Sequence, residues 1–284
     1  MDVSIIFVNY KTKDLTVNAI KSVIEKTEGI EYEILVIDND SQDGSVEAIE
    51  QEFPFVKITK NETNKGFGAA NNQGIEQSQG KYVFCLNTDT ILYNNAVKIL
   101  FDFMEKNQDF GACGANLYHQ DMSPAYSCAD MHNTWNCSAI YWLLKLIFKK
   151  YCSPREINTL KYTDMVTGAD LFMRKSVLDK IGLFDENIFM YSEDMDLCKR
   201  IKDNDYQIAI IPEAKIIHLE GRNKKNFLKR TQMVVKGKYY FLKKHKMFMP
   251  RFVMQLTYCI LHLICIIFTF NKEHLELLKT HFEG

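Results

Sequence analysis

The sequence predicts an α/β protein in which a mostly parallel sheet is flanked by helices, and two observations support this prediction. Short apolar runs rich in β-branched residues alternate, from Val3 to Asn107, with longer stretches whose apolar residues recur at helical spacing. This alternation is typical of a parallel sheet that is covered on both faces. The composition of the 284-residue chain, 46% hydrophobic and 25% charged, is that of an ordinary globular protein.

The first two strands and the helices after them follow from local patterns. Val3 to Tyr10 reads V-S-I-I-F-V-N-Y, a β-branched run that predicts a buried strand. Asp14 can cap the next helix, whose apolar stripe runs from Leu15 to Ile24. Glu33 to Asp38 (E-I-L-V-I-D) predicts the second strand, and Ser45 is expected to cap a short helix that ends at Phe53.

The same alternation continues to the middle of the chain. Val56 to Thr59 predicts a third strand, and Asn64 to Ser78 begins with glycines and becomes helical. Tyr82 to Leu86 is five apolar residues long, which suits a buried strand, and Asn95 to Asn107 has a strong helical stripe. Two further strands are expected on either side of Pro212, over Ile208–Ile211 and Lys215–Leu219.

The most informative stretch is G-K-Y-V-F-C-L-N-T-D, residues 80–89, because its apolar run ends abruptly in Asn87, Thr88 and Asp89. In open α/β sheets, ligands bind just beyond the carboxyl ends of the strands. A carboxylate there is well placed to hold a hard divalent cation, which is commonly shared with substrate phosphates. Asn87, Thr88 and Asp89 are also residue types that favour an ordinary turn without a ligand. Asp38 ends the second strand at the same edge, where it can accept a hydrogen bond from a base or a ribose hydroxyl.

Two other groups are candidates for a site. The segment N-K-G-F-G-A-A-N-N, residues 64–72, has glycines that let the backbone approach a ligand closely or that serve a tight turn. Residues 189–201 read F-M-Y-S-E-D-M-D-L-C-K-R-I, with Glu193, Asp194 and Asp196 in one helical turn. These carboxylates exceed what a helix N-terminus needs, and crowding raises their pKa values, which suits a general base. His218 ends a strand and is either structural or a metal ligand.

The net charge of −1 conceals an asymmetry, because residues 222–251 contain eleven Lys or Arg and no Asp or Glu. We call residues 222–251 the basic segment; the chain before it is acidic overall. No nucleic-acid-binding motif accompanies its aromatic residues, so no nucleic acid partner is expected. Eight Cys without a C-x-x-C pair give no support for a zinc site. With no export signal apparent, they suggest the reducing cytoplasm.

Phe252 to Phe270 is a 19-residue stretch without Asp, Glu, Lys or Arg. As a helix it would be about 28 Å long, close to the thickness of the hydrocarbon core. Its less apolar residues would fall on one line along the helix surface, which comprises Gln255, Tyr258, His262, Cys265 and Thr269. Such a helix could lie in the membrane interface, span the membrane, or pack inside a soluble protein. The basic segment before it favours an anionic cytoplasmic membrane surface. The apolar run 139–148 leaves open a core helix or one lying on a membrane.

Taken together and in order, seven motifs resemble the family 2 glycosyltransferases with a GT-A fold, and in particular the rhamnosyltransferase-like branch of bacterial polysaccharide biosynthesis. The resemblance covers about residues 1–225. The motifs are V-N-Y (8–10), V-I-D-N-D-S-Q-D-G-S (36–45), N-K-G-F-G-A-A-N-N (64–72), L-N-T-D (86–89), T-G-A-D (167–170), S-E-D-M-D-L-C-K-R (192–200) and H-L-E-G-R (218–222). Asn87 departs from the family pattern, because it stands where the first Asp of a D-x-D motif is usual.

The resemblance implies a role for each matching residue. Those expected to bind the nucleotide-sugar are Asn9, Tyr10, Asp38, Asn64, Gly66, Phe67, Asn71 and Asn87. Asp89, assisted by His218, would bind Mg²⁺ or Mn²⁺. Asp194 would be the catalytic base with Glu193 beside it. The acceptor would be bordered by Gly168, Ala169 and Asp170.

The implied reaction is an inverting, metal-dependent transfer of a sugar from a dTDP- or UDP-sugar, with rhamnose as a candidate. The implied acceptor is a saccharide carried on a lipid, in cell-surface polysaccharide synthesis. Two alternatives stay open, namely a non-catalytic carbohydrate-binding or scaffold protein and a sugar nucleotidyltransferase.

The expected organisation is a GT-A catalytic domain over residues 1–221, followed by a helical region over 222–284 that associates with a membrane. The catalytic domain would comprise a nucleotide-binding half, 1–118, and an acceptor half, 119–221. The expected location is the cytoplasm, peripheral on the inner face of the plasma membrane, with a single C-terminal span as the alternative.

Overall fold

The computed structural model describes residues 1–133, 136–138, 156–219, 227–269 and 272–283. The apolar run 139–148 and the last three residues of the motif at 218–222 lie outside these ranges. The chain divides into two compact units. The first contains the described residues of 1–130, 154–187 and 193–221, and the second those of 131–153, 188–192 and 222–284.

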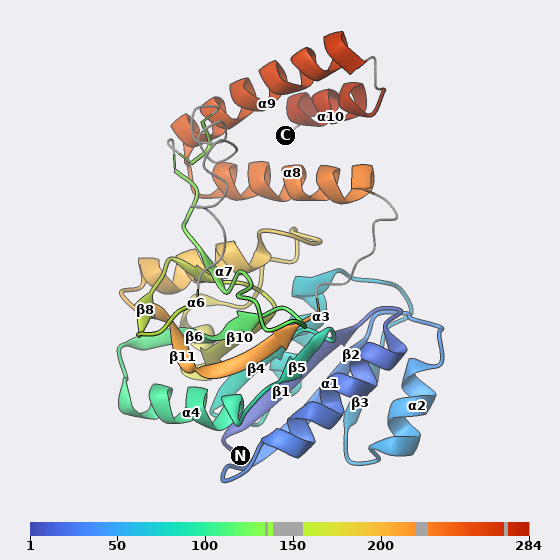
Figure 1. Cartoon of the computed structure of the whole chain (residues 1–284), viewed down its shortest axis with the longest axis vertical. Helices are drawn as coiled ribbons and strands as arrows, with labels where there is room; N and C mark the ends of the chain where they lie inside the picture. Colours follow the sequence, from blue (N-terminus) through green and yellow to red (C-terminus); the bar gives the residue numbers. More distant parts are fainter. Residues whose placement is uncertain (134–135, 139–155, 220–226, 270–271, 284) are drawn as a thin grey trace. The chain divides into compact units, whose positions relative to one another are not determined.

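The first unit is built on one sheet of nine described strands, in the order β3-β2-β1-β4-β10-β6-β11-β5, with β8 on β11 (Figure 1). The expected strands are present as β1 (Val3–Asn9), β2 (Tyr32–Asp38), β3 (Lys57–Lys60) and β4 (Tyr82–Leu86). The others are β5 (Thr90–Leu92), β6 (Phe110–Tyr118), β8 (Lys161–Tyr162), β10 (Asp170–Arg174) and β11 (Gln207–His218). A separate pair is formed by β7 (Cys128–Ala129) and β9 (Met165–Val166).

Strand direction changes across this sheet. Strands β3, β2, β1 and β4 are parallel to one another, as the alternating pattern predicts. Strand β10 then runs antiparallel to both β4 and β6, and β5 runs antiparallel to β11. Because the first four strands are parallel, their carboxyl ends meet at one edge of the sheet. The α/β class predicted from the sequence is confirmed.

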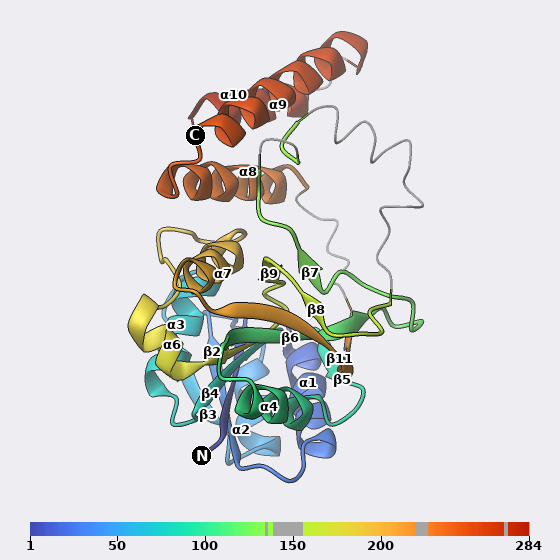
Figure 2. The same ribbon diagram turned by 90° about the vertical axis from the view of Figure 1, so that its left-hand side faces the viewer.

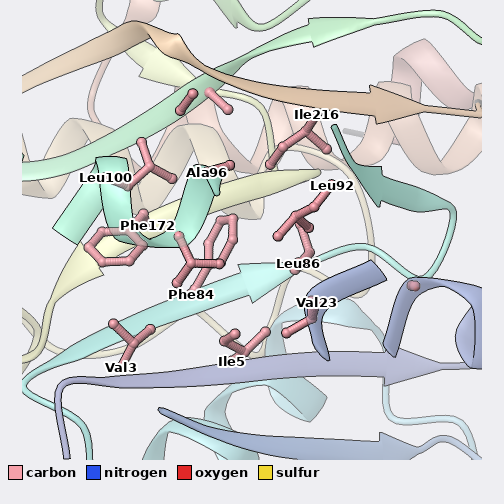
Figure 3. Close-up of a cluster of buried hydrophobic side chains, with 14 of the residues drawn as sticks. Val3, Ile5, Val23, Phe84, Leu86, Leu92, Ala96, Leu100, Phe172 and Ile216 are labelled. Atoms are coloured by element: carbon pink, nitrogen blue, oxygen red, sulfur yellow. The ribbon is translucent and has the colours of Figure 1, made fainter. Parts of the chain in front are cut away.

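Helices cover both faces of the sheet (Figures 1 and 2). The helices of this unit are α1 (Lys13–Lys26), α2 (Ser45–Glu52), α3 (Phe67–Gln77), α4 (Ala96–Lys106), α6 (Lys175–Ile181) and α7 (Glu193–Asp203). Strand β1 shows why both faces are apolar, since Ile5 packs in the core beneath α1 and α4 whereas Ile6 meets Gly74 of α3. The face on the side of Ile5 carries the main core, part of which is drawn in Figure 3. There Phe84 and Phe172 have ring centroids 5.5 Å apart.

Three local expectations differ from the structure. The strands expected on either side of Pro212 form one strand, β11, whose pairing with β6 shifts register between Ile211 and Lys215. Ser45 does not cap α2; it is the first helical residue, and the Asp43 carboxylate accepts its N–H at 3.1 Å. Asp14 lies inside the first turn of α1, which begins at Lys13. The predicted elements are therefore present, but their boundaries differ from the predicted ones.

The second unit contains three described helices, α8 (Phe227–Lys244), α9 (Phe248–Thr269) and α10 (Lys272–Glu283). Helix α9 turns Gln255 and Tyr258 toward α10. Gln255 Nε2 donates to the His281 carbonyl at 3.0 Å, and the Tyr258 ring stacks on the His281 ring with centroids 4.8 Å apart. Large apolar side chains of the same helix are exposed, namely Phe248, Met249, Phe252, Leu256, Ile260, Leu261 and Leu263. Among the described residues, no helix has the length and apolar character needed to cross a membrane.

Candidate active site

Asn9 organises the edge where β1 and β2 end. Its side-chain Nδ2 donates to Asp38 Oδ1 at 2.6 Å and to Ser41 Oγ at 2.9 Å. The second carboxylate oxygen of Asp38 accepts the Ser41 N–H at 3.0 Å. Asn9 thus fixes the orientation of Asp38, and the Asn9 side chain itself is fully buried. Tyr10, the next residue, has 44% of its surface exposed. Its ring is available to a ligand at this edge.

A cavity of about 420 Å³ opens beside Asp38. It lies between the loop that follows β2 and the end of β3, and its lining includes Asp40, Ser45, Lys60 and Asn61. A volume of this order falls within the range of ligand pockets in proteins. The Asp38 carboxylate therefore combines two features of a binding group, because it is held rigidly and it borders an open cavity.

Asp89 and His218 meet although 128 residues separate them, since the distance between Asp89 Oδ1 and His218 Nε2 is 3.3 Å. The pairing of β5 with β11 produces this approach, because its register places His218 opposite Thr90, the residue after Asp89. The Leu219 N–H also donates to the Asp89 carbonyl at 2.8 Å. The sequence predicted these two residues as joint metal ligands, and the fold brings their side chains together.

The two side chains suit a divalent cation. A carboxylate oxygen is the donor that Mg²⁺ and Mn²⁺ favour, and the imidazole offers a nitrogen donor beside it. Within the described parts of the chain, no group of three or more His, Cys, Asp or Glu side chains could hold a metal ion. A cation bound at Asp89 and His218 would therefore share its remaining positions between water and substrate oxygens, as Mg²⁺ commonly does.

The glycine-rich loop turns sharply into helix α3. The Asn64 side chain accepts the Gly66 N–H at 2.9 Å, and Gly66 adopts a φ of 90°, which favours glycine. The carbonyl of Gly66 accepts a hydrogen bond from Asn39 Nδ2 at 3.1 Å, which ties the loop to the end of β2. Asn71 is buried in α3, where its Nδ2 donates to the Phe67 carbonyl at 3.0 Å. Asn64 and Asn71 thus shape the loop from within.

The T-G-A-D turn, residues 167–170, connects three of the predicted motifs. The Gly168 N–H donates to Asp194 Oδ2 at 2.9 Å, and the Ala169 carbonyl accepts the Asn87 N–H at 2.9 Å. A Cβ added to Gly168 would lie 3.5 Å from the Phe67 ring, so the glycine-rich loop reaches the same turn. Two residues of this turn thus place Asp194 and Phe67 within one small region and anchor the motif that carries Asp89.

Asp170, the last residue of this turn, is fully buried. Its Oδ2 accepts the Ala115 N–H at 2.6 Å, which links β10 to β6. Burial raises the pKa of the Asp170 carboxyl well above its usual range. Gly168 and Ala169 therefore lie against the other site residues, whereas the side chain of Asp170 lies inside the sheet.

Glu193 and Asp194 begin helix α7 in contrasting surroundings. Glu193 is buried, and desolvation together with the charge of Asp194 raises its pKa to about 8. Asp194 is partly exposed, and its pKa is also raised, mainly by desolvation. The Asp194 carboxylate nevertheless accepts N–H bonds from Gly168 and Met195, which favour its ionised form. Both pKa values thus lie above the ordinary range of a carboxyl, and the two groups are linked because the charge of Asp194 raises the pKa of Glu193.

We predict that Glu193 makes stability depend on pH. An unfolded Glu has a pKa of about 4.3, whereas burial raises that of Glu193 to about 8. Between these values the folded state retains a proton that the unfolded state has lost, so the free energy of unfolding falls as pH rises. The glutamine of Glu193→Gln carries no charge at any pH. The difference in melting temperature between this variant and the wild type should therefore move in favour of the variant between pH 5 and pH 9.

Thermal denaturation at several pH values tests this expectation. Glu213→Gln, which changes an exposed residue, is the matched control and should show no such trend. A constant difference between Glu193→Gln and the wild type at every pH would contradict the assignment.

Asp196, the third acidic residue of this turn, has a structural role. Asp196 is fully buried, and its Oδ2 accepts a hydrogen bond from Arg200 Nε at 2.9 Å. Arg200 also donates to the carbonyls of residues 181–183, and so anchors the loop that follows α6. The three acids of this turn thus divide into a buried group with a raised pKa, a partly exposed group that accepts backbone N–H bonds, and an ion-paired group.

Several connecting residues were not anticipated from the sequence. The hydroxyl of Thr12 donates to Asn9 Oδ1 at 2.8 Å and lies 3.1 Å from the hydroxyl of Thr88. Asn39 joins the end of β2 to Asn61, whose Nδ2 donates to Asn39 Oδ1 at 2.9 Å. The only sequence signal for these residues is that small polar residues follow each strand. The order of the strands in the sheet decides which of these residues form hydrogen bonds with one another.

Comparison with known proteins gives a consistent result. The model of the family described as "Glycosyl transferase family 2" matches residues 4–182. An uncharacterised glycosyltransferase of Methanocaldococcus jannaschii is 26% identical over 247 residues, which are 86% of this chain and 79% of that protein. The N-acetylglucosaminyl-diphospho-decaprenol L-rhamnosyltransferase of Mycobacterium tuberculosis is 26% identical over 201 residues, which are 65% of this chain and 66% of that protein.

Solved structures share the fold. A mannosyltransferase from Pyrobaculum calidifontis, in complex with GDP-Man and Mn²⁺, gives a TM-score of 0.62 at 12% identity. That match covers 98% of this chain and 83% of the other. GalNAc-T7 with UDP, GalNAc and Mn²⁺ gives a TM-score of 0.59 at 18% identity and covers 85% of this chain and 50% of the other. The family model spans more than half of the chain and the fold is GT-A, so this chain belongs to the family 2 glycosyltransferases and is an enzyme that transfers sugars.

Proposed function

We propose that this glycosyltransferase inverts the anomeric configuration, depends on a divalent metal, and takes its sugar from a dTDP- or UDP-sugar. The observation that carries the proposal is the turn at 167–170. Its Gly168 N–H donates to the Asp194 carboxylate, and its Ala169 carbonyl accepts the N–H of Asn87, two residues before Asp89. A general base and a metal-binding carboxylate are thereby anchored to one short segment.

The donor nucleotide is proposed to lie along the edge formed by β1, β2 and β4. Asp38 is oriented by Asn9 beside the 420 Å³ cavity and can accept the N3–H of uracil or thymine. Tyr10 offers an exposed ring to the nucleoside. The similarity to an L-rhamnosyltransferase supports rhamnose as the first sugar to test.

The proposed chemistry assigns one step to Asp194. Its carboxylate removes the proton from an acceptor hydroxyl, and that oxygen displaces the nucleoside diphosphate from the anomeric carbon in a single in-line step. The raised pKa of Asp194 brings its basicity closer to neutral pH, where general-base catalysis works best. When bound at Asp89 and His218, Mg²⁺ or Mn²⁺ would stabilise the negative charge on the departing diphosphate.

The acceptor is proposed to be a saccharide carried on a lipid, in the synthesis of a cell-surface polysaccharide. It would enter beside Gly168 and Ala169, where Asp194 is held. The M. tuberculosis relative carries decaprenol in its name, which supports an acceptor of this class. With a lipid-linked acceptor, the enzyme is proposed to work at the cytoplasmic face of the plasma membrane.

Helix α9 supports this location. Phe252 and Leu256 are 61% and 51% exposed, although the same helix turns Gln255 and Tyr258 toward α10. An exposed apolar stripe next to a strongly basic segment is typical of a helix that lies in the membrane interface. We therefore propose that α9 lies in the interface of an anionic membrane.

A thermal-shift screen tests the proposed donor. The probes are UDP, dTDP and GDP, each with and without Mn²⁺, and bound ligand should raise the melting temperature. A metal-dependent rise with one pyrimidine nucleotide supports the proposal and identifies the base. If folded protein responds to none of them, the proposal fails and a non-catalytic carbohydrate-binding role gains support.

Vesicle sedimentation tests the proposed membrane contact. Replacing both Phe252 and Leu256 with Glu should weaken binding to phosphatidylglycerol vesicles at least tenfold, because each large apolar side chain contributes about 1.5–3 kcal/mol when buried. Tyr162→Glu is the matched control, since Tyr162 is an exposed aromatic residue of the other unit. Absence of vesicle binding by the wild type would refute the contact. Dimers that the double variant abolishes would instead assign the face to a second copy.

A further inference from the structure

The residues just before the proposed catalytic pair have an unusual backbone. Tyr191 and Ser192 have φ angles of 70° and 78°, and no other two adjacent non-glycine residues in the described ranges both have positive φ. Such conformations are unfavourable for residues with a Cβ and persist only where the surrounding structure enforces them. Glu193, the next residue, is the first of helix α7. Some feature of the fold must therefore hold this segment in place.

That feature is one face of helix α8. A Cβ added to Gly237 would lie 2.2 Å from the Tyr191 carbonyl oxygen and 3.4 Å from Ser192 Oγ, so only glycine permits this approach. The Arg230 guanidinium lies over the Tyr191 ring at 5.7 Å. Positions 230 and 237 are seven residues apart and share one face of the helix. Helix α8 thus contacts both the ring and the carbonyl of Tyr191.

Glycine in the middle of a long helix has a local disadvantage. Gly237 is ten residues from the start of α8 and seven from its end, and glycine is a poor helix former in the interior of a helix. Alanine at this position would favour the helix, yet would collide with backbone rather than with a flexible side chain. The residue at 237 therefore suits the contact with Tyr191 and not the helix itself.

Two other glycines contact the pair itself, at ordinary van der Waals and hydrogen-bond distances. A Cβ added to Gly68 would lie 3.7 Å from Glu193 Cβ, and Gly168 donates to the Asp194 carboxylate. Of these three glycines, only Gly237 lies where an added Cβ would collide with the backbone of this segment. Because Tyr191 precedes Asp194 by only three residues, a displacement of Tyr191 is transmitted directly to the first turn of α7.

We propose that Gly237 is a positioning residue, which lets α8 fix Tyr191 and Ser192 and thereby sets the placement of Glu193 and Asp194. This inference rests on the proposed role of Asp194 as general base. Gly237 is proposed to act through Tyr191 and Ser192 and not through contact with the donor or the acceptor. A small misplacement of a general base is sufficient to slow a reaction severely, since proton transfer requires hydrogen-bond distance.

Gly237→Ala in the full chain tests the proposal. The turnover number, measured as release of nucleoside diphosphate from the donor identified by the screen, should fall at least tenfold. The affinity for UDP or dTDP with Mn²⁺ should stay within about twofold, because the nucleotide edge is built from β1, β2 and β4. The ascending limb of the pH–rate profile should also move, since the surroundings of both carboxyls change. Lys236→Ala, at an exposed neighbouring position of α8, is the matched control and should resemble the wild type.

Tyr191→Gly provides a second test should Gly237→Ala fail to fold. Glycine adopts the φ of position 191 without strain and removes the ring beneath Arg230, which should loosen the start of α7. Turnover should fall while nucleotide affinity is retained. Wild-type turnover in a folded form of either variant would overturn the proposal, and so would equal losses of turnover and nucleotide affinity.

Two reference samples separate this proposal from the proposed function. If the wild type releases no nucleoside diphosphate from any donor, or if Asp194→Asn turns over normally, the proposed function itself fails. If Asp194→Asn is inactive while Gly237→Ala is normal, only the positioning role of Gly237 fails.

Discussion

Asp194→Asn is expected to lower the turnover number about a thousandfold while leaving nucleotide affinity unchanged. A general base contributes roughly 10²- to 10⁴-fold to a reaction, and an amide cannot accept the acceptor's proton. The substituted side chain keeps an oxygen that can accept the Gly168 N–H, which is 2.9 Å from Asp194 Oδ2 in the wild type. Since the turn at 167–170 would be preserved, the loss should be chemical and not structural.

The measurement is steady-state turnover together with thermal-shift titration of the nucleotide. Asp203→Asn is the matched control, because Asp203 ends the same helix and its carboxylate pairs with Lys199 in an exposed position. That control should retain wild-type turnover. Normal activity of Asp194→Asn would remove Asp194 from catalysis and point to its neighbour Glu193.

Asp89→Ala is expected to abolish the effect of Mn²⁺ on nucleotide binding and to lower kcat/KM at least a hundredfold. In the wild type, the carboxylate of Asp89 lies 3.3 Å from His218 Nε2, so its removal leaves only the imidazole of this pair to bind a cation. A metal ion that stabilises charge on a leaving group contributes several kcal/mol to catalysis, which corresponds to a loss of this size.

Chelation supplies an independent check on the same site. EDTA should reduce wild-type turnover to the level of Asp89→Ala, and added Mn²⁺ should restore only the wild type. Asp102→Ala is the matched control, since Asp102 pairs with Lys98 on the surface of α4. Wild-type turnover that is indifferent to EDTA would contradict metal dependence.

Asp170 shows that a sequence motif does not by itself tell where each of its side chains lies in the structure. The residue stands in the T-G-A-D motif, where the resemblance implied a border of the acceptor site. In the structure its carboxyl is fully buried and accepts the Ala115 N–H of β6. The motif identified the turn, but strand pairing decided which of its residues face the site.

Strand β6 shows why part of the sheet was not anticipated. Its sequence F-G-A-C-G-A-N-L-Y, residues 110–118, contains small residues and none that is β-branched, so it has weak strand character. The structure explains this composition, because a Cβ at Gly111 would lie 2.7 Å from Ile201 and one at Gly114 would lie 2.4 Å from Val166. Close packing against distant segments selected these glycines.

The sequence by itself determined the α/β class, the positions of the first four strands along the chain and the polar residues at their carboxyl ends. Those features depend on apolar periodicity and turn residues, which act over a few positions. Only the tertiary structure placed His218 beside Asp89, through the pairing of β11 with β5. It also raised the pKa of Glu193 through burial and gave the Asp194 carboxylate the Gly168 N–H as a donor, because these surroundings come from segments remote in sequence. Pairing and burial are long-range properties, and no local pattern encodes them.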